Sequence, residues 1–152
     1  MVTHETLARM DLFEGLPDEV LTCIAELSRE ESYPLGTTIF AAGRPADRMY
    51  LLLEGTVSLW VQPTSLPEPM TVVVLRSPGQ TFGWSAVVGS GYYTAGAQAT
   101  SDARAISIDG QALVDCLEQH PCEGFVVMRR VAQVVSQRLG SVRTLLLETV
   151  CG

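Results

Sequence analysis

The sequence contains no lysine, and all ten of its basic residues are arginine. They are outnumbered by 17 acidic residues, which gives a formal net charge of −7. Apart from Arg129 and Arg130, the arginines are scattered along the chain. An acidic chain without a basic patch is a poor candidate for contacting a phosphate backbone. We therefore expect no direct DNA binding by this chain.

The sequence also lacks the motifs of several chemical sites. Its two histidines and four cysteines show neither CxxC nor zinc-finger spacing, so we expect no metal site and no cofactor. It has no GxSxG, HExxH or P-loop sequence, and we predict that it is not an enzyme. No apolar run approaches the roughly 18 residues that span a bilayer, and residues 1–10 contain no apolar signal-peptide core. These absences predict a cytoplasmic protein with no membrane partner.

What the chain does contain is a large apolar fraction. Apolar residues make up 47% of its 152 residues, and the mean hydropathy is +0.22. This composition predicts either a large core or a core together with an interface. The length is that of one ordinary domain, so we expect residues 1–152 to form a single domain.

Hydrophobic periodicity divides the chain into three parts. Residues 1–32 have apolar residues at helical spacing. Residues 33–109 break into short β-branched runs separated by glycine, proline and aspartate, which favours a small antiparallel roll or sandwich. Residues 110–152 return to helical spacing, with Asp109 as the expected cap of the first of these helices. The predicted fold class is α+β, mainly β: a jelly-roll or double-stranded β-helix (a β-roll) with N-terminal helices and a long C-terminal helix.

The last helical segment has the most regular pattern in the chain. Apolar residues recur there at intervals of alternately 3 and 4, which is the heptad seam of a helix that pairs with another helix. A second stripe, formed by Val127, Val131 and Val134, lies beside this seam. Either both stripes form one wide face on the domain's own roll, or the seam pairs with a twin helix and makes a homodimer, which we favour. The seam residues are Phe125, Met128, Ala132, Val135, Leu139, Val142 and Leu146.

The order of short motifs resembles one known family. The stretch "YPLGTTIFAAGRPADRMYLLLEGTVSLW" has the glycine and apolar rhythm that opens the β-roll of cyclic-nucleotide-binding domains. The stretch "LRSPGQTFGWSA" resembles the start of that family's phosphate-binding cassette, which here covers residues 79–97. The resemblance extends over nearly the whole chain and implies a regulatory, ligand-sensing domain. The matching positions are Gly36, Ile39, Gly43, Asp47, Met49, Tyr50, Gly55 and Val57.

Two positions of the cassette depart from the family pattern. The resemblance implies a glutamate after Gly83, which binds a ribose hydroxyl, and an arginine before Thr94, which neutralises the cyclic phosphate. Trp84 and Tyr93 stand at these positions. Without the glutamate and the arginine, we expect little affinity for cyclic AMP or cyclic GMP, and the two rings either fill the pocket or line it for another ligand. The candidate ligand-binding residues are Phe82, Gly83, Trp84, Ser85, Ala86, Tyr93 and Thr94.

Three functions follow from these features. The first is a regulatory module that takes a small ligand, a cyclic nucleotide or a replacement for one, and reports its presence through the long helix. The turn at Gly83 would expose the backbone N–H groups of a short helix near Trp84 to such a ligand. The second is a ligand-free module for dimerisation or protein interaction. The third is the sensor part of a transcription regulator whose DNA-binding part is absent. Arg76 and Arg104 lie on other predicted strands, so the sequence alone offers no evident substitute for the missing arginine.

Overall fold

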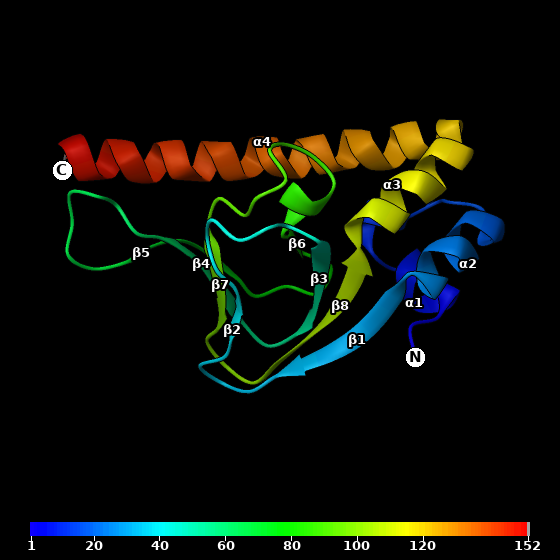
Figure 1. Ribbon diagram of the computed structural model, residues 1–152, viewed down its shortest axis with the longest axis horizontal. Helices are drawn as coiled ribbons and strands as arrows, with labels where there is room; N and C mark the ends of the chain where they lie inside the picture. Colours follow the sequence, from blue (N-terminus) through cyan, green and yellow to red (C-terminus); the bar gives the residue numbers. More distant parts are fainter. Residues whose placement is uncertain (152) are drawn as a thin grey trace.

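The computed structural model describes the backbone of residues 1–151 and the side chains of residues 1–148. Helices occupy both ends of the chain, and strands lie between them (Figure 1). The N-terminal helices are α1 (His4–Ala8), the 3-10 turn η1 (Asp11–Phe13) and α2 (Asp18–Glu26). The C-terminal helices are α3 (Gly110–Gln119) and α4 (Pro121–Cys151).

The strands form two antiparallel sheets of four. The first sheet has the order β1 (Ser28–Tyr33), β8 (Ala103–Asp109), β3 (Arg48–Glu54) and β6 (Thr81–Phe82). The second has the order β2 (Thr38–Phe40), β7 (Gly96–Ala99), β4 (Val57–Val61) and β5 (Met70–Leu75). Most neighbours in each order are distant in sequence, as in a double-stranded β-helix. The predicted fold class is confirmed.

Two apolar clusters hold this arrangement together, one on each face of the first sheet. On β3, Met49 and Leu51 pack with the helices, whereas Tyr50 and Leu52 face the interior of the roll. This alternation is the two-residue period of a strand covered on both faces. The first sheet therefore separates the helical layer from the roll interior, and the loops around β6 lie where the two layers meet.

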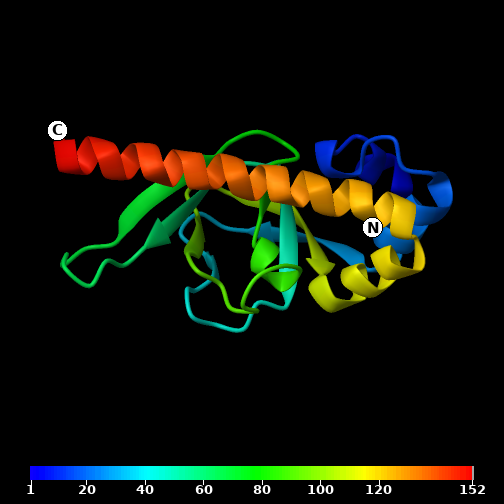
Figure 2. The ribbon, with the colours of Figure 1, turned by 90° about the horizontal axis from the view of Figure 1, so that it is seen from above.

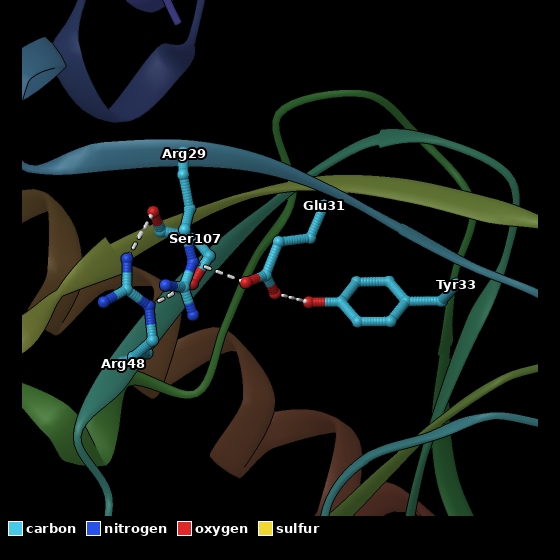
Figure 3. A network of polar contacts seen from close by, with 5 residues as sticks. All are labelled: Arg29, Glu31, Tyr33, Arg48 and Ser107. Carbon is cyan, nitrogen blue, oxygen red and sulfur yellow. Dashed lines mark hydrogen bonds and ion pairs between the residues drawn. The ribbon is translucent and has the colours of Figure 1, made fainter. Parts of the chain in front are cut away.

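The boundary predicted between helices and strands is wrong by a few residues. Helical spacing is expected as far as residue 32, but β1 begins at Ser28. Its sequence is almost entirely polar, and side chains along one face of the strand form hydrogen bonds to one another. The Arg29 guanidinium and the Tyr33 hydroxyl both donate to the Glu31 carboxylate (Figure 3). A strand whose polar side chains bond to one another in this way shows no apolar alternation in its sequence.

The helix α4 crosses the molecule from α3 to the hairpin of β4 and β5 (Figures 1 and 2). Val127 and Val131, from the second stripe, are fully buried in the helical layer. At the start of α3, Asp109 accepts a hydrogen bond from the Ala112 N–H at 3.0 Å, so the predicted helix cap is confirmed. Within residues 1–151, no helix has the length and apolarity needed to cross a bilayer.

Candidate functional site

The cassette begins with a left-handed glycine between β6 and a single 3-10 turn, η2 (Trp84–Ala86). Gly83 has a φ of +74°. A Cβ at this position would lie 3.0 Å from the Tyr50 ring and 3.2 Å from the Arg48 carbonyl oxygen. Both the backbone angle and the crowding favour glycine here. The turn therefore brings the cassette backbone directly against β3.

Tyr93 occupies the space that faces this turn. Its side chain is only 5% exposed, and its ring stacks on that of Phe40 with the centroids 3.8 Å apart. The Tyr93 hydroxyl donates to the carbonyl oxygen of Arg48 at 2.6 Å. Burial raises the pKa of this hydroxyl, so it remains a neutral donor. Packing and a directed hydrogen bond thus hold the ring in place.

Four aromatic rings together form the inner wall of the cassette. Phe40 stacks on Tyr50 and Phe82 as well as on Tyr93, and Tyr50 stacks on Phe82 at 5.1 Å. The cavity that remains has a volume of about 40 Å³, whereas pockets for organic ligands usually measure ~300–1,000 Å³. Little space therefore remains beside these rings. The lining residues are Phe40, Leu59, Gly83, Trp84, Ser85, Tyr93, Thr94 and Ala95.

Five of the seven predicted ligand-binding residues line this cavity, and two do not. Phe82 lies beneath it in the ring stack, and Ala86 packs against the start of α3. A Cβ on Gly110 would come within 2.4 Å of the Ala86 carbonyl oxygen. Helix α3 can therefore approach the cassette backbone only because residue 110 is glycine.

Trp84 lies at the junction between the cassette and α4. The guanidinium carbon of Arg138 is 5.3 Å from the centroid of the Trp84 ring, within the range of a cation–π contact. Arg138 Nη2 donates to the carbonyl oxygen of Thr81 at 2.7 Å. Its Nη1 is buried and has no hydrogen-bond partner among the residues described. Burial lowers the pKa of this guanidinium.

Arg76 and Arg104, which the sequence places away from the cassette, do not serve it in the structure either. Arg104 pairs with Glu30 and Glu54 on the surface of the first sheet, and Arg76 follows β5, where its side chain is exposed. Two other arginines are closer. Besides Arg138, the structure places Arg48 at the cassette, but its side chain donates to the hydroxyl and the carbonyl oxygen of Ser107 (Figure 3).

Sequence reasoning therefore missed Arg138, Arg48 and the ring of Phe40. Phe40 ends β2, but nothing in the local sequence indicates that its ring would stack on Tyr93. Arg138 stands far along the chain from Trp84, and its position in the last helix carries no cassette motif. Only the path of α4 across the roll brings these two residues together.

The heptad seam of α4 is largely uncovered in the single chain. Phe125, Leu139 and Leu146 are 67%, 60% and 60% exposed, and Val142 and Ala132 are also exposed. Met128 and Val135 are half-buried against the helical layer. The two stripes thus have different surroundings: the valine stripe packs on the domain, whereas most of the seam faces outward. The homodimer stays a prediction.

These features define a structural class. A β-roll carries a glycine-led loop, and a long helix contacts that loop through Arg138 and Trp84.

Comparison with known proteins places the chain within that class. The family model described as the cyclic nucleotide-binding domain matches residues 30–120. The chain belongs to the cyclic nucleotide-binding domain family, as its motifs predicted.

Solved structures and a curated relative agree with this assignment. A protein from Geobacter metallireducens GS-15, assigned as cyclic nucleotide-binding, is 37% identical, with a TM-score of 0.80, over 91% of this chain and 99% of its own. The N-terminal domain of a transcriptional regulator from Streptomyces coelicolor is 25% identical, with a TM-score of 0.68, over 93% of this chain and 95% of its own. A CRP-like cAMP-activated global transcriptional regulator from Mycobacterium tuberculosis is 26% identical over 89% of this chain. The match spans only 58% of that regulator's length.

Proposed function

We propose that this chain is a regulatory sensor domain whose cassette is closed by its own aromatic rings and has little affinity for cyclic AMP or cyclic GMP. The observation that carries this proposal is the position of Tyr93. Its ring stacks on Phe40, and its hydroxyl bonds to the Arg48 carbonyl oxygen, at the place where the family pattern has a phosphate-binding arginine. A cyclic nucleotide would have to displace this ring before it could enter.

The energetics disfavour such displacement. A charge-assisted hydrogen bond to a phosphate contributes about 1.5–3 kcal/mol, and this cassette has no guanidinium in that position. Entry would also break the Tyr93 hydroxyl bond and separate its ring from Phe40. The negative phosphate would then lie among aromatic rings without a neutralising partner, which is costly in a partly dry site. A less charged ligand that exchanges places with Tyr93 meets a smaller penalty.

The output of this sensor runs through α4. Trp84 belongs to the cassette, and Arg138 belongs to α4, so a ligand that moves the Trp84 ring also removes the surface on which Arg138 rests. The exposed seam on the same helix is the surface through which we expect two copies to pair. A change at the cassette would then alter the position of α4 in the dimer.

A second candidate function is a ligand-free dimerisation module. The small volume of the cavity favours it, since about 40 Å³ holds no more than a few waters. A third is the sensor part of a transcription regulator, which is supported by the S. coelicolor and M. tuberculosis relatives. In all three, the chain pairs through α4 and catalyses no reaction.

Calorimetric titration of the full chain with cyclic AMP and with cyclic GMP tests the proposal. We expect dissociation constants above roughly 100 μM for both, because positions 84 and 93 carry neither the ribose acceptor nor the phosphate cation, which weakens binding by about a hundredfold or more. Micromolar binding of either nucleotide would overturn the proposal and show that another residue supplies the positive charge.

A further inference from the structure

A half-enclosed groove of about 400 Å³ lies on the side of α4 that faces η1 and the loop joining β5 to β6. In Figure 2 this loop is the green segment that runs beside α4. Its walls are the α4 side chains Arg130, Gln133, Gln137 and Arg138, with Asp11 and Gly79 opposite. The volume lies within the range of small-ligand pockets, ~300–1,000 Å³. Its lining is separate from the cassette cavity, with which it shares no residue.

Two arginines face this groove, and neutral acceptors hold both of them. Arg130 Nη1 donates to the carbonyl oxygens of Leu12 and Glu14 at 3.2 and 2.7 Å. Arg138 donates to the Thr81 carbonyl oxygen. Neither guanidinium forms an ion pair with a carboxylate among the described residues. Carbonyl oxygens orient a guanidinium without cancelling its charge, so two positive charges remain at the groove of an otherwise acidic protein.

The groove also contains side-chain N–H groups that make no hydrogen bond within the described residues and are therefore available to an anion. No acceptor or donor among the described residues bonds the side-chain amides of Gln133 and Gln137, or the Nε and Nη2 atoms of Arg130. Asp11 is the carboxylate among the lining residues, and it leaves the groove with an excess of positive charge. Guanidinium and amide N–H groups are the donors that bind carboxylate and phosphate oxygens.

We propose that this groove binds a small oxyanion, the carboxylate or phosphate group of a small molecule, through Arg130, Gln133 and Gln137, with Arg138 at its inner end. The site does not depend on the proposed function of the cassette. At about 100° per residue, Arg130, Gln133 and Gln137 lie roughly 130–170° around α4 from the centre of the heptad seam, and Arg138 lies about 90° from it. A dimer formed through the seam therefore leaves the groove open. The bound anion would bridge α4 and the loop after β5.

Titration of the ¹⁵N-labelled full chain, followed by NMR at constant ionic strength, tests this site. Sodium phosphate is the probe in one arm and sodium citrate in the other, with sodium chloride as the reference salt. We expect saturable shifts at the amides of Gly79 and Gln133 with one or both anions, and the arm that saturates first identifies the preferred oxyanion. Arg130→Gln should weaken binding by about tenfold to a hundredfold, since it removes a charge-assisted hydrogen bond.

Arg143→Gln is the matched control, because it removes the same charge from an exposed position of α4 that does not line the groove. It should leave the binding constant unchanged. Shifts with phosphate and citrate no larger than those with chloride would overturn the proposal. An equal loss in Arg143→Gln and Arg130→Gln would also overturn it, because the anions would then respond only to the overall charge of the helix. Neither result would affect the cyclic nucleotide titrations of the cassette.

Discussion

Arg138 and Trp84 join the cassette to the long helix through one contact, with the guanidinium carbon 5.3 Å from the ring centroid. The same guanidinium donates to the carbonyl oxygen of Thr81, at the start of β6. Arg138 therefore holds both the strand that enters the cassette and the turn that follows it. Because the contact is between side chains, its energy can be isolated by mutation.

A double-mutant cycle should detect this contact. Trp84→Leu and Arg138→Gln are expected to couple by about 0.5–2 kcal/mol in the free energy of unfolding, the range of a partly desolvated cation–π pair. Urea unfolding of the wild type, both single variants and the double variant provides the measurement. Trp60→Leu with Arg138→Gln is the control, because Trp60 packs on Gly96 in the second sheet. Coupling no larger in the first cycle than in the control would contradict the contact.

The hydroxyl of Tyr93 should contribute measurably to stability. Tyr93→Phe removes the donor to the Arg48 carbonyl oxygen and leaves that oxygen short of a partner, which we expect to cost about 0.5–1.5 kcal/mol. Tyr93→Ala also empties the ring site, at a cost of about 3–5 kcal/mol. Denaturant midpoints of the two variants check both values. Tyr92→Phe is the matched control, since Tyr92 is its exposed neighbour in sequence, and it should change little.

The fold could be predicted from the sequence where the type of a residue depends on its local backbone angle or burial. The glycines at 36, 43, 55, 79 and 83 all have positive φ, and the apolar runs between them became the strands. β1 escaped prediction because Arg29, Glu31 and Tyr33 satisfy one face of it by hydrogen bonding. Its partner strand β8 lies far along the chain, so no local pattern indicates the pairing.

In the candidate site too, the local backbone was predictable from the sequence, whereas the contacts between distant side chains were not. The loop backbone was predictable because Gly83 is visible in the sequence, and only glycine readily adopts the left-handed φ and the close approach to the Tyr50 ring found there. The contents of the pocket were not, because a sequence shows that Tyr93 replaces an arginine but not where its ring points. Arg138 reaches Trp84 from a helix whose direction depends on the packing of Val127 and Val131. Contacts of this kind are set by the assembled layers rather than by any motif.

The seam of α4 should hold two copies together. We expect the wild type to sediment as a dimer at tens of micromolar, and Leu139→Glu with Val142→Glu to give a monomer, because two charges would then lie in an apolar interface. These positions are exposed in the single chain, so the changes should not disturb the domain itself. Val135 is a less specific probe, since it packs partly on the helical layer.

Ser136→Glu controls for added charge, because Ser136 is exposed on α4 outside the seam. That variant should sediment like the wild type. A wild-type monomer at these concentrations would refute the dimer, and so would a Leu139→Glu, Val142→Glu variant that remains dimeric.

Stability should fall at alkaline pH through three tyrosines, of which Tyr50 and Tyr93 are buried and Tyr33 is half-buried. Burial raises the pKa of Tyr33, and its hydrogen bond to Glu31 raises it further; burial also raises the pKa values of Tyr50 and Tyr93. Above about pH 10, the ordinary tyrosine pKa, the unfolded chain releases protons that the folded chain retains. The stabilisation from these groups is therefore complete below pH 10 and decreases as pH rises above it.

Urea midpoints measured between about pH 8 and pH 11 should show this loss, given that tyrosine titrates near pH 10 when unfolded. Burial also raises the pKa of the Cys116 thiol, to about 12, and adds a loss of the same sign that begins at lower pH. Tyr33→Phe should make the decline less steep. A midpoint independent of pH over this range would mean that these hydroxyls are not buried as the structure shows.

The cassette should regain cyclic nucleotide binding when its two missing groups are restored. Trp84→Glu with Tyr93→Arg supplies an acceptor for the ribose hydroxyl and a cation for the phosphate, and it removes both rings from the pocket. We expect the affinity for cyclic AMP to rise by about a hundredfold or more, measured by calorimetric titration beside the wild type. Tyr93→Arg alone should do more than Trp84→Glu alone, because it both introduces the charge and clears the ring that stacks on Phe40.

Arg138 should help the Trp84→Glu change. Its buried Nη1 has no partner among the described residues, and its guanidinium lies over position 84. A glutamate there would find a cation beside it, which should hold the carboxylate in the cassette. Removing a packed ring from a buried site can cost about 3–5 kcal/mol for each ring, so a melting curve must accompany each titration. Tyr92→Arg, with the same added charge at the exposed neighbour, should not bind. A folded double variant that still ignores both nucleotides would show that the pocket is built for a different ligand, because the charge and the space would then both be present without effect.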